Sequence, residues 1–123
     1  MIATAQLETA ARSWMDNWNS RSMENLMTHY ADDVVLYSPT VTKRWGIPSG
    51  KLEGKAAVEK HFRKGMEQLP GMRFDFFALL MGFGSVVLLY KRETGLLAAD
   101  FVLFNKDGKV KEVRTHWAES PVS

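Results

Sequence analysis

Four strand-length apolar segments, separated by short turns, make up the second half of the chain and limit its fold more than any other feature. The segments cover residues 74–81, 86–92, 96–105 and 110–118. The turns between them all contain glycine: Gly82-Phe83-Gly84, Glu93-Thr94-Gly95 and Lys106-Asp107-Gly108. Because tight glycine turns join neighbouring antiparallel strands, we predict a curled antiparallel sheet built as a meander.

The first half of the chain has the spacing of amphipathic helices. Three helices are predicted, each with one apolar face. The residues of these faces are Leu7, Ala11, Trp14, Met15 and Trp18 in the first helix, Met23, Leu26, Met27 and Tyr30 in the second, and Val58, Phe62, Met66 and Leu69 in the third. Ser22 suits the N-cap of the second helix, and Pro70-Gly71 ends the third, which begins at Lys55. Between the second and third helices, Ala31-Asp32-Asp33 predicts a turn and residues 34–38 a strand stopped by Pro39.

Residues 40–53 contain two glycines, a proline and one aromatic side chain, Trp45, and predict a long loop. Long loops in compact domains often serve as lids or binding loops. A surface excursion whose Trp45 packs against the domain is the alternative, and the sequence leaves both open.

The chain of 123 residues is long enough for one domain over residues 1–123, with one sizeable core. Helices followed by a meander predict an α+β fold, with three N-terminal-half helices packed on one face of the curled sheet. The net charge of +2 comes from 16 scattered basic and 14 acidic residues, which argues against nucleic acid. No apolar stretch is long enough to span a membrane and no signal-peptide pattern is present, so we expect a cytoplasmic protein.

Asp100 stands alone in the apolar segment 96–104. A buried carboxylate without a cation or several donors should hold its proton near neutral pH, with a raised pKa. A neutral carboxylic acid in an apolar wall can donate a hydrogen bond to a ligand oxygen, which makes Asp100 a candidate catalytic residue. A structural acid, bonded to backbone amides or to a basic residue across the sheet such as Arg92, Arg114 or Lys91, remains the alternative.

Other chemistry-bearing residues are few. The chain has no cysteine, which excludes thiol catalysis, and its three histidines lack metal-ligand spacing, so neither a metal nor another cofactor is expected. His61 on the third helix is placed to face the interior near Ser38. Strand alternation puts Thr115 and Trp117 on one face and His116 on the other.

Several stretches resemble the nuclear transport factor 2-like superfamily, which includes SnoaL-like polyketide cyclases and ketosteroid isomerases. The stretches are residues 25–34, similar to a "YADDV" entry into the first strand, residues 52–58, similar to a glycine entry into the third helix, and residues 100–110, similar to a strand and "DGK" turn. The resemblance spans nearly the whole chain and implies a cone-shaped fold, with the helices on the concave face of the sheet. It specifies function weakly, because one fold hosts enzymes, binding proteins and transport adaptors.

The ketosteroid isomerase branch matches this chain only in part. Asp100 falls where that branch has a neutral aspartic acid, Tyr30 where it has a supporting tyrosine, and Trp117 where it has a pocket tryptophan. Ser38 replaces the branch's general base and Trp14 its oxyanion-hole tyrosine. Because serine cannot abstract a carbon-bound proton unaided, the usual ketosteroid isomerase activity is not expected.

Two functions follow from these observations. The first is a SnoaL-like enzyme acting on a hydrophobic carbonyl compound by acid or acid-base catalysis, without metal, as an isomerase, cyclase or hydro-lyase. Asp100 would be catalytic, with His61 and Ser38 assisting. The second is a non-catalytic module of the same fold that binds an apolar ligand or a partner subunit.

The expected ligand is a small apolar or aromatic molecule. Its expected contacts are Trp14, Trp18, Tyr30, Trp45, Phe62, Met66, Val102 and Trp117. Leu89, Phe101 and Leu103 are too apolar to leave the convex sheet face bare, so we also expect a homodimer through that face.

Overall fold

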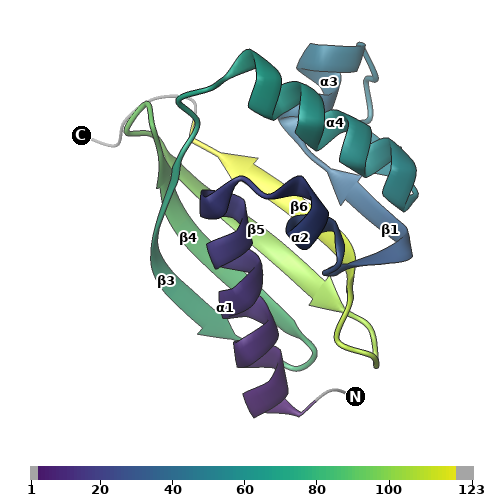
Figure 1. The fold of residues 1–123 in the computed structure, drawn as a ribbon, viewed down its shortest axis with the longest axis vertical. Helices are drawn as coiled ribbons and strands as arrows, with labels where there is room; N and C mark the ends of the chain where they lie inside the picture. Colours follow the sequence, from purple (N-terminus) through teal and green to yellow (C-terminus); the bar gives the residue numbers. More distant parts are fainter. Residues whose placement is uncertain (1–2, 119–123) are drawn as a thin grey trace.

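The computed structural model describes residues 3–118 and shows helices packed on one face of a six-stranded sheet (Figure 1). The elements are, in order, α1 (Thr4–Ser20), α2 (Met23–Met27), β1 (Tyr30–Tyr37), α3 (Pro39–Trp45), β2 (Lys51–Glu53), α4 (Lys55–Gln68), β3 (Phe74–Met81), β4 (Ser85–Arg92), β5 (Leu97–Phe104) and β6 (Val110–Trp117). The predicted α+β architecture is therefore confirmed.

The sheet has the strand order β2-β1-β6-β5-β4-β3. β3, β4, β5 and β6 form the predicted meander of antiparallel neighbours. The expectation of a wholly antiparallel sheet was wrong at one place, because β1 pairs with β6 in parallel. The long connection through α3 and α4 makes this parallel pairing possible.

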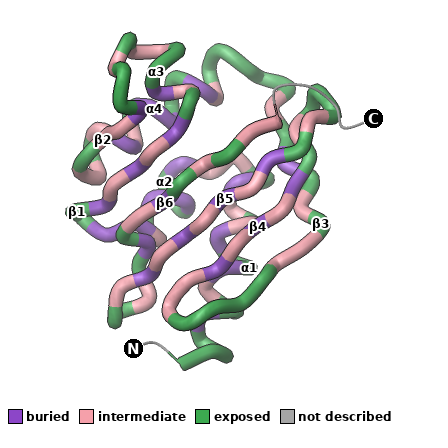
Figure 2. Tube along the Cα trace, turned by 180° about the vertical axis from the view of Figure 1, so that it is seen from behind, coloured by how far each residue is buried: buried purple, intermediate pink, exposed green. Residues whose placement is uncertain are grey.

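Alternation of the strand side chains places the core on the helical face of the sheet. Figure 2 shows buried and half-buried positions alternating along β4 and β5. The buried set on β5 is Ala98, Asp100, Val102 and Phe104. Asp100 therefore faces the helices, as predicted.

The start of β1 differs from the prediction. Tyr30 does not continue the second helix, which ends at Met27, but is the first residue of β1. Asp32 and Asp33 lie within this strand rather than in a turn, and both are exposed. The pairing register with β6 shifts between Tyr30 and Val35, which lets the strand admit two adjacent outward carboxylates.

Residues 40–53 are also not a long loop, because they contain α3 and β2. The Ser38 side chain caps α3 by accepting a hydrogen bond from the Thr40 backbone N–H, and Pro39 occupies the first turn. The helix ends at Gly46, whose φ of 70° is the left-handed conformation that favours glycine. Pro39 thus starts a helix as well as ending a strand, and α3 carries Trp45 as its last residue.

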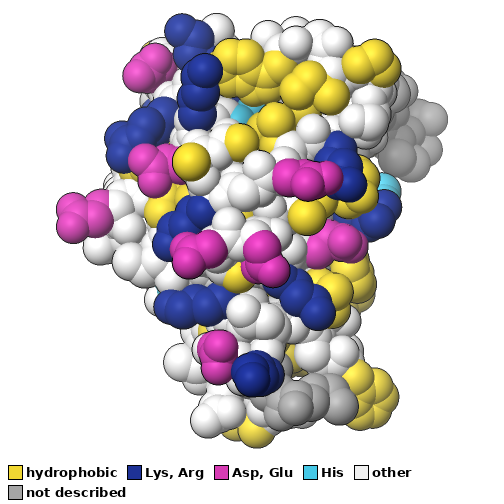
Figure 3. Space-filling view, turned by 90° about the vertical axis from the view of Figure 1, so that its right-hand side faces the viewer, with side chains coloured by type: hydrophobic (Ala, Val, Ile, Leu, Met, Phe, Trp, Pro, Cys, Tyr) yellow, Lys and Arg dark blue, Asp and Glu magenta, His cyan; other side chains and the backbone are white. Residues whose placement is uncertain are grey.

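The convex face of the sheet carries large exposed apolar side chains. Phe77 is 57% exposed, Leu80 53% and Leu97 38%, and the half-buried Phe101 lies among them. The side of the molecule shown in Figure 3 is different, because basic and acidic side chains are interspersed there. Within the described residues, no helix is both long and apolar enough to cross a membrane.

Candidate functional site

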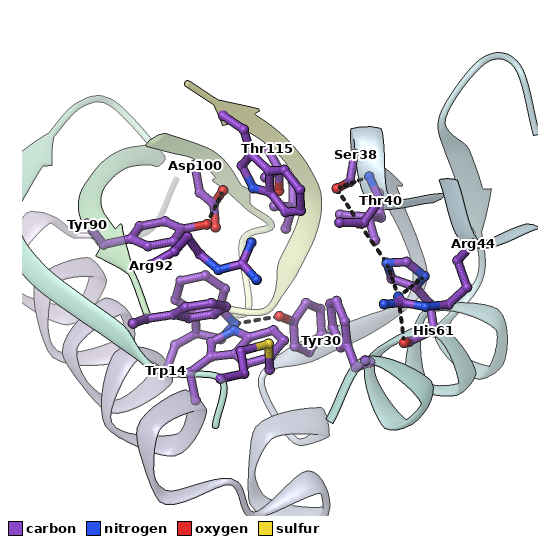
Figure 4. A pocket seen from close by; sticks show the side chains of 18 residues that line it. Trp14, Tyr30, Ser38, Thr40, Arg44, His61, Tyr90, Arg92, Asp100 and Thr115 are labelled. Atoms are coloured by element: carbon purple, nitrogen blue, oxygen red, sulfur yellow. Dashed lines mark hydrogen bonds between the residues drawn. The ribbon is translucent and has the colours of Figure 1, made fainter. Parts of the chain in front are cut away.

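A cavity of about 80 Å³ lies between the concave face of the sheet and the helices (Figure 4). Its lining comes from α1, α3, α4 and five of the strands: Trp14, Trp18, Tyr30, Leu36, Ser38, Thr40, Arg44, His61, Phe62, Gly65, Met72, Phe74, Tyr90, Arg92, Asp100, Val113, Thr115 and Trp117. Aromatic rings dominate the wall, and Trp18 packs edge-on against Phe62 with the ring centroids 4.7 Å apart.

The structure brings most of the predicted site residues together. All three candidate catalytic residues, Asp100, His61 and Ser38, line the cavity. Five of the eight predicted ligand contacts do so as well: Trp14, Trp18, Tyr30, Phe62 and Trp117. The other three lie outside the lining: Val102 is buried in the core beyond Asp100, Met66 packs half-buried on α4, and Trp45 lies behind His61.

Asp100 is 6% exposed and projects from the middle of β5 into the cavity. It lies opposite Leu88 of β4 on one side and Thr115 of β6 on the other. The Tyr90 hydroxyl donates a hydrogen bond of 3.1 Å to Asp100 Oδ1. Within residues 3–118, no salt bridge to Asp100 is present.

Burial raises the pKa of Asp100 from its ordinary value of 3.8 to about 6. The Thr115 and Tyr90 hydroxyls, and the charges of His116 and Arg92, offset part of this rise. The pKa therefore shifts in the predicted direction. A pKa of about 6 nevertheless leaves most of the carboxyl ionised at pH 7, so the predicted protonated state applies only below about pH 6.

Arg92, the last residue of β4, is the cation that shares the cavity with Asp100 and lowers its pKa. Its guanidinium points into the cavity beside Tyr90 and Asp100 (Figure 4). The guanidinium carbon lies 4.6 Å from the ring centroid of Trp117 and 5.5 Å from that of Phe74. These rings hold the guanidinium in place by cation–π contact. Its contact with Glu93 uses a single nitrogen at 3.4 Å, which leaves the other N–H groups to face a ligand.

His61 is neutral and its tautomer is fixed by its neighbours. The Trp45 indole N–H donates to His61 Nδ1 at 3.0 Å, and since an indole can only donate, Nδ1 carries no proton. Nε2 then carries the proton and donates to Thr40 Oγ1 at 3.0 Å. Burial and the charge of Arg44 lower the pKa of His61 to about 4. His61 is therefore a hydrogen-bond donor at neutral pH, not a general base.

The same chain of hydrogen bonds includes Ser38. Thr40 Oγ1 and Ser38 Oγ lie 2.6 Å apart, and either hydroxyl can be the donor of the hydrogen bond between them. Ser38 Oγ also accepts from the Thr40 backbone N–H at 3.3 Å. These contacts hold the Ser38 hydroxyl at the cavity wall.

Tyr30 presents a second oriented hydroxyl. The Trp14 indole N–H donates to Tyr30 Oη at 2.7 Å, so this oxygen is the acceptor and its proton remains for another partner. Burial raises the pKa of Tyr30 well above its ordinary value of 10, which keeps the phenol protonated. Tyr30 thus offers the cavity a donor.

Five polar lining residues were not predicted as site residues: Thr40, Arg44, Tyr90, Arg92 and Thr115. Thr40 and Arg44 belong to α3, and the Ser38-Pro39 pair with Gly46 was the available helix signal. Tyr90 and Arg92 belong to β4, where alternation from the buried Val86 and Leu88 places them on the same face. Within residues 3–118, no three acidic or histidine side chains converge as a metal site requires.

Comparison with known proteins agrees with this geometry. A model of the SnoaL-like domain matches residues 11–117, which include every cavity residue named above. The chain belongs to the SnoaL-like domain family. A comparison with proteins of curated function found no match.

Solved structures extend the likeness. A SnoaL-like protein of unknown function from Burkholderia thailandensis is 32% identical, with a TM-score of 0.86 over 96% of this chain and 99% of that one. A putative ketosteroid isomerase from Kribbella flavida is 23% identical, with a TM-score of 0.78 over 98% of this chain and 83% of that one. A putative polyketide cyclase from Sinorhizobium meliloti is 10% identical, with a TM-score of 0.74 over 88% and 94% of the two chains. The last two share the fold of this SnoaL-like chain.

Proposed function

We propose that this SnoaL-like protein is a metal-independent enzyme that moves a proton at a carbon next to a carbonyl group in a small, mostly apolar ligand. The observation that carries the proposal is Asp100, a carboxyl inside an aromatic cavity whose pKa of about 6 lies close to neutral pH. A general base works best when its pKa is near the working pH, because it is then both ionised and basic.

The cavity offers groups for each part of such a reaction. Ionised Asp100 accepts the proton from carbon as the C–H bond breaks. The electron pair forms the enolate C=C bond, and the carbonyl oxygen takes the negative charge. Arg92 lies beside Asp100 and stabilises that oxygen, with Ser38 or Tyr30 as hydroxyl donors. Protonated Asp100 then returns the proton to another carbon, to a leaving hydroxyl group or to a new alkoxide.

The size of the cavity restricts the ligand. One water centre needs about 10–15 Å³, so about 80 Å³ holds roughly six waters, or a ligand of about one substituted ring. A fused polycyclic molecule does not fit this volume without movement of the lining. The cavity volume therefore supports a single-ring carbonyl compound as the ligand.

The experiment is hydrogen-deuterium exchange at the carbon next to the carbonyl, followed by proton NMR in heavy water. The probes are two single-ring ketones: acetophenone, which has no carboxylate, and 4-acetylbenzoate, which has one. We expect the wild-type protein to accelerate exchange and Asp100→Asn to abolish the acceleration. Asp75→Asn, which changes an exposed carboxylate on β3, is the matched control. Acceleration that survives in Asp100→Asn contradicts the proposed base.

A non-catalytic binding module is the second candidate. Ser38 supports it, because this position holds a serine hydroxyl where the resembled isomerases have their base. In that case the same probes bind, as shown by quenching of the cavity tryptophans, without any Asp100-dependent exchange. The exchange assay therefore separates the two candidates.

We also propose that the protein forms a homodimer through the convex face of the sheet. Phe77, Leu80 and Leu97 are exposed there beside half-buried Leu89 and Phe101, which makes a larger apolar surface than a monomer usually leaves to water. Light scattering at micromolar concentration tests this assembly, and a monomeric mass contradicts it.

A further inference from the structure

We propose that the ligand carries a carboxylate held between Arg92 and Arg44, so that the substrate class is a single-ring carboxylic acid. This inference rests on the proposal that the cavity holds a ligand. It adds the charge of that ligand, which the apolar wall alone does not indicate.

Arg92 is the first reason. Its side chain is only 12% exposed, and its Nε–H is buried without a hydrogen-bond partner among the described residues. Its contact with Glu93 uses a single nitrogen at 3.4 Å, which is a long distance for a charged pair. A buried guanidinium with free donors is costly unless an anion binds it.

Arg44 is the second reason. Its Nε donates to the Gln68 side chain at 3.1 Å and its NH1 group contacts His61, but neither partner carries a negative charge. No carboxylate within residues 3–118 forms a salt bridge with Arg44. Burial and the charge of Arg92 lower the pKa of Arg44, so the two guanidinium groups repel each other across the cavity. Figure 4 shows them entering from opposite sides.

The balance of donors and acceptors is the third reason. The indole N–H of Trp117 is also buried without a hydrogen-bond partner among residues 3–118, and Trp117 lines the cavity. Tyr30 accepts from the Trp14 indole N–H, which leaves its phenol proton to be donated. Among the described residues, Asp100 is the one carboxyl that lines the cavity. An excess of donors in an apolar site selects a ligand rich in oxygen acceptors.

These positions also orient the ligand. Ionised Asp100 repels a carboxylate, so the acid group belongs at the end of the cavity toward Arg44 and the reacting carbon at the end toward Asp100. The ring between them packs on Trp18 and Phe62, and Arg92, whose guanidinium has five N–H donors, faces the carboxylate from the side opposite Arg44.

The test compares benzoate with benzamide, which has the same ring and nearly the same shape without the charge. Binding is followed by tryptophan fluorescence and calorimetry at neutral pH. We expect benzoate to bind at least about tenfold more tightly, as two charge-assisted contacts should provide. Arg92→Gln and, independently, Arg44→Gln should each remove most of this preference. Arg12→Gln, at an exposed position on α1, should leave it unchanged.

Equal affinity for benzoate and benzamide overturns the inference, as does a benzoate preference that survives in both arginine variants with native circular dichroism spectra. Lack of saturable benzoate binding in the millimolar range overturns it as well. Benzoate has no exchangeable carbon-bound proton, so its binding is independent of catalysis. If benzoate is preferred but exchange does not depend on Asp100, the proposed enzyme activity is refuted and this inference stands. If exchange depends on Asp100 but benzoate is not preferred, the enzyme activity stands and this inference is refuted.

Discussion

Replacing Asp100 with asparagine should stabilise the protein at neutral pH and leave its stability nearly unchanged below pH 4. Asparagine keeps the shape of the side chain and an oxygen to accept from Tyr90, but it carries no charge to desolvate. The rise of the Asp100 pKa from 3.8 to about 6 is worth about 3 kcal/mol, at about 1.4 kcal/mol per pH unit.

The sign follows from proton linkage. The folded state binds the Asp100 proton more tightly than the unfolded state, so the wild-type protein has its full contribution below pH 3.8. That contribution is lost as the pH rises through about 6, because the ionised carboxylate is then buried. Above pH 7 the difference between Asp100→Asn and the wild type should reach its plateau of about 3 kcal/mol.

Urea unfolding of both proteins, from pH 4 to pH 8, measures this difference. Subtracting the two curves removes the contribution of every other titrating group, and Asp75→Asn controls for the loss of an exposed carboxylate. A difference that does not change with pH refutes the reasoning. So does a variant that is less stable at pH 7, which would mean that the charge of Asp100 is already compensated in the folded state.

Further predictions concern the His61 chain and the convex face. Nitrogen-15 NMR should show the Nε2–H tautomer of neutral His61 down to about pH 4, and a ring already charged at pH 6 contradicts the assigned donors. Trp45→Phe removes one donor to Nδ1 but leaves Arg44 as the other, so the Nε2–H tautomer should persist; the double variant Trp45→Phe/Arg44→Gln should let the two tautomers mix. Leu80→Lys places a charge on the exposed apolar face and should convert a dimer to a monomer in light scattering without lowering the melting temperature by more than a few degrees.

The sequence predicted the helices and strands whose turn residues and apolar periodicity agree with the positions that the folded protein buries. β3 to β6 lie where the sequence predicts them, because glycine turns set the ends of these strands. Two-residue alternation sets their faces, which placed Asp100 and Trp117 on the cavity side. α4 matches its predicted range because its apolar positions repeat through a full set of turns. Long, periodic segments of this kind depend little on the rest of the chain.

The sequence did not predict α3, for a physical reason. A helix of seven residues is too short to show a repeating apolar face, and only Val41 is buried in it. Its end signals, Ser38-Pro39 and Gly46, also fit a strand followed by a loop. Because α3 was missed, Arg44 and Thr40 were missed with it. The inward position of Arg92 was not predicted either, although two-residue alternation from Val86 through Leu88 and Tyr90 places it on the core face of β4.

The proposed function reverses the roles that the family resemblance implied for the two ends of the cavity. In the resembled isomerases the base would stand at the position of Ser38 and a neutral acid at that of Asp100. Here Ser38 is a hydroxyl, which cannot abstract a carbon-bound proton unaided, and a pKa of about 6 leaves most of Asp100 ionised at pH 7. Under the proposed function, Asp100 is therefore the base.

This reversal predicts the direction of the pH profile. If Asp100 is the base, kcat/KM for exchange should rise with pH through about 6 and level off above pH 7, since this ratio reports the free enzyme. A bound carboxylate near Arg92 would offset the cation that now lowers the Asp100 pKa, so the kcat profile should rise at a higher pH than the kcat/KM profile. If Asp100 instead acts as the acid, the rate falls as the pH rises through about 6. A falling profile in the wild type, absent in Asp100→Asn, would return Asp100 to the role of a neutral donor and leave the proton without an acceptor among the described cavity residues.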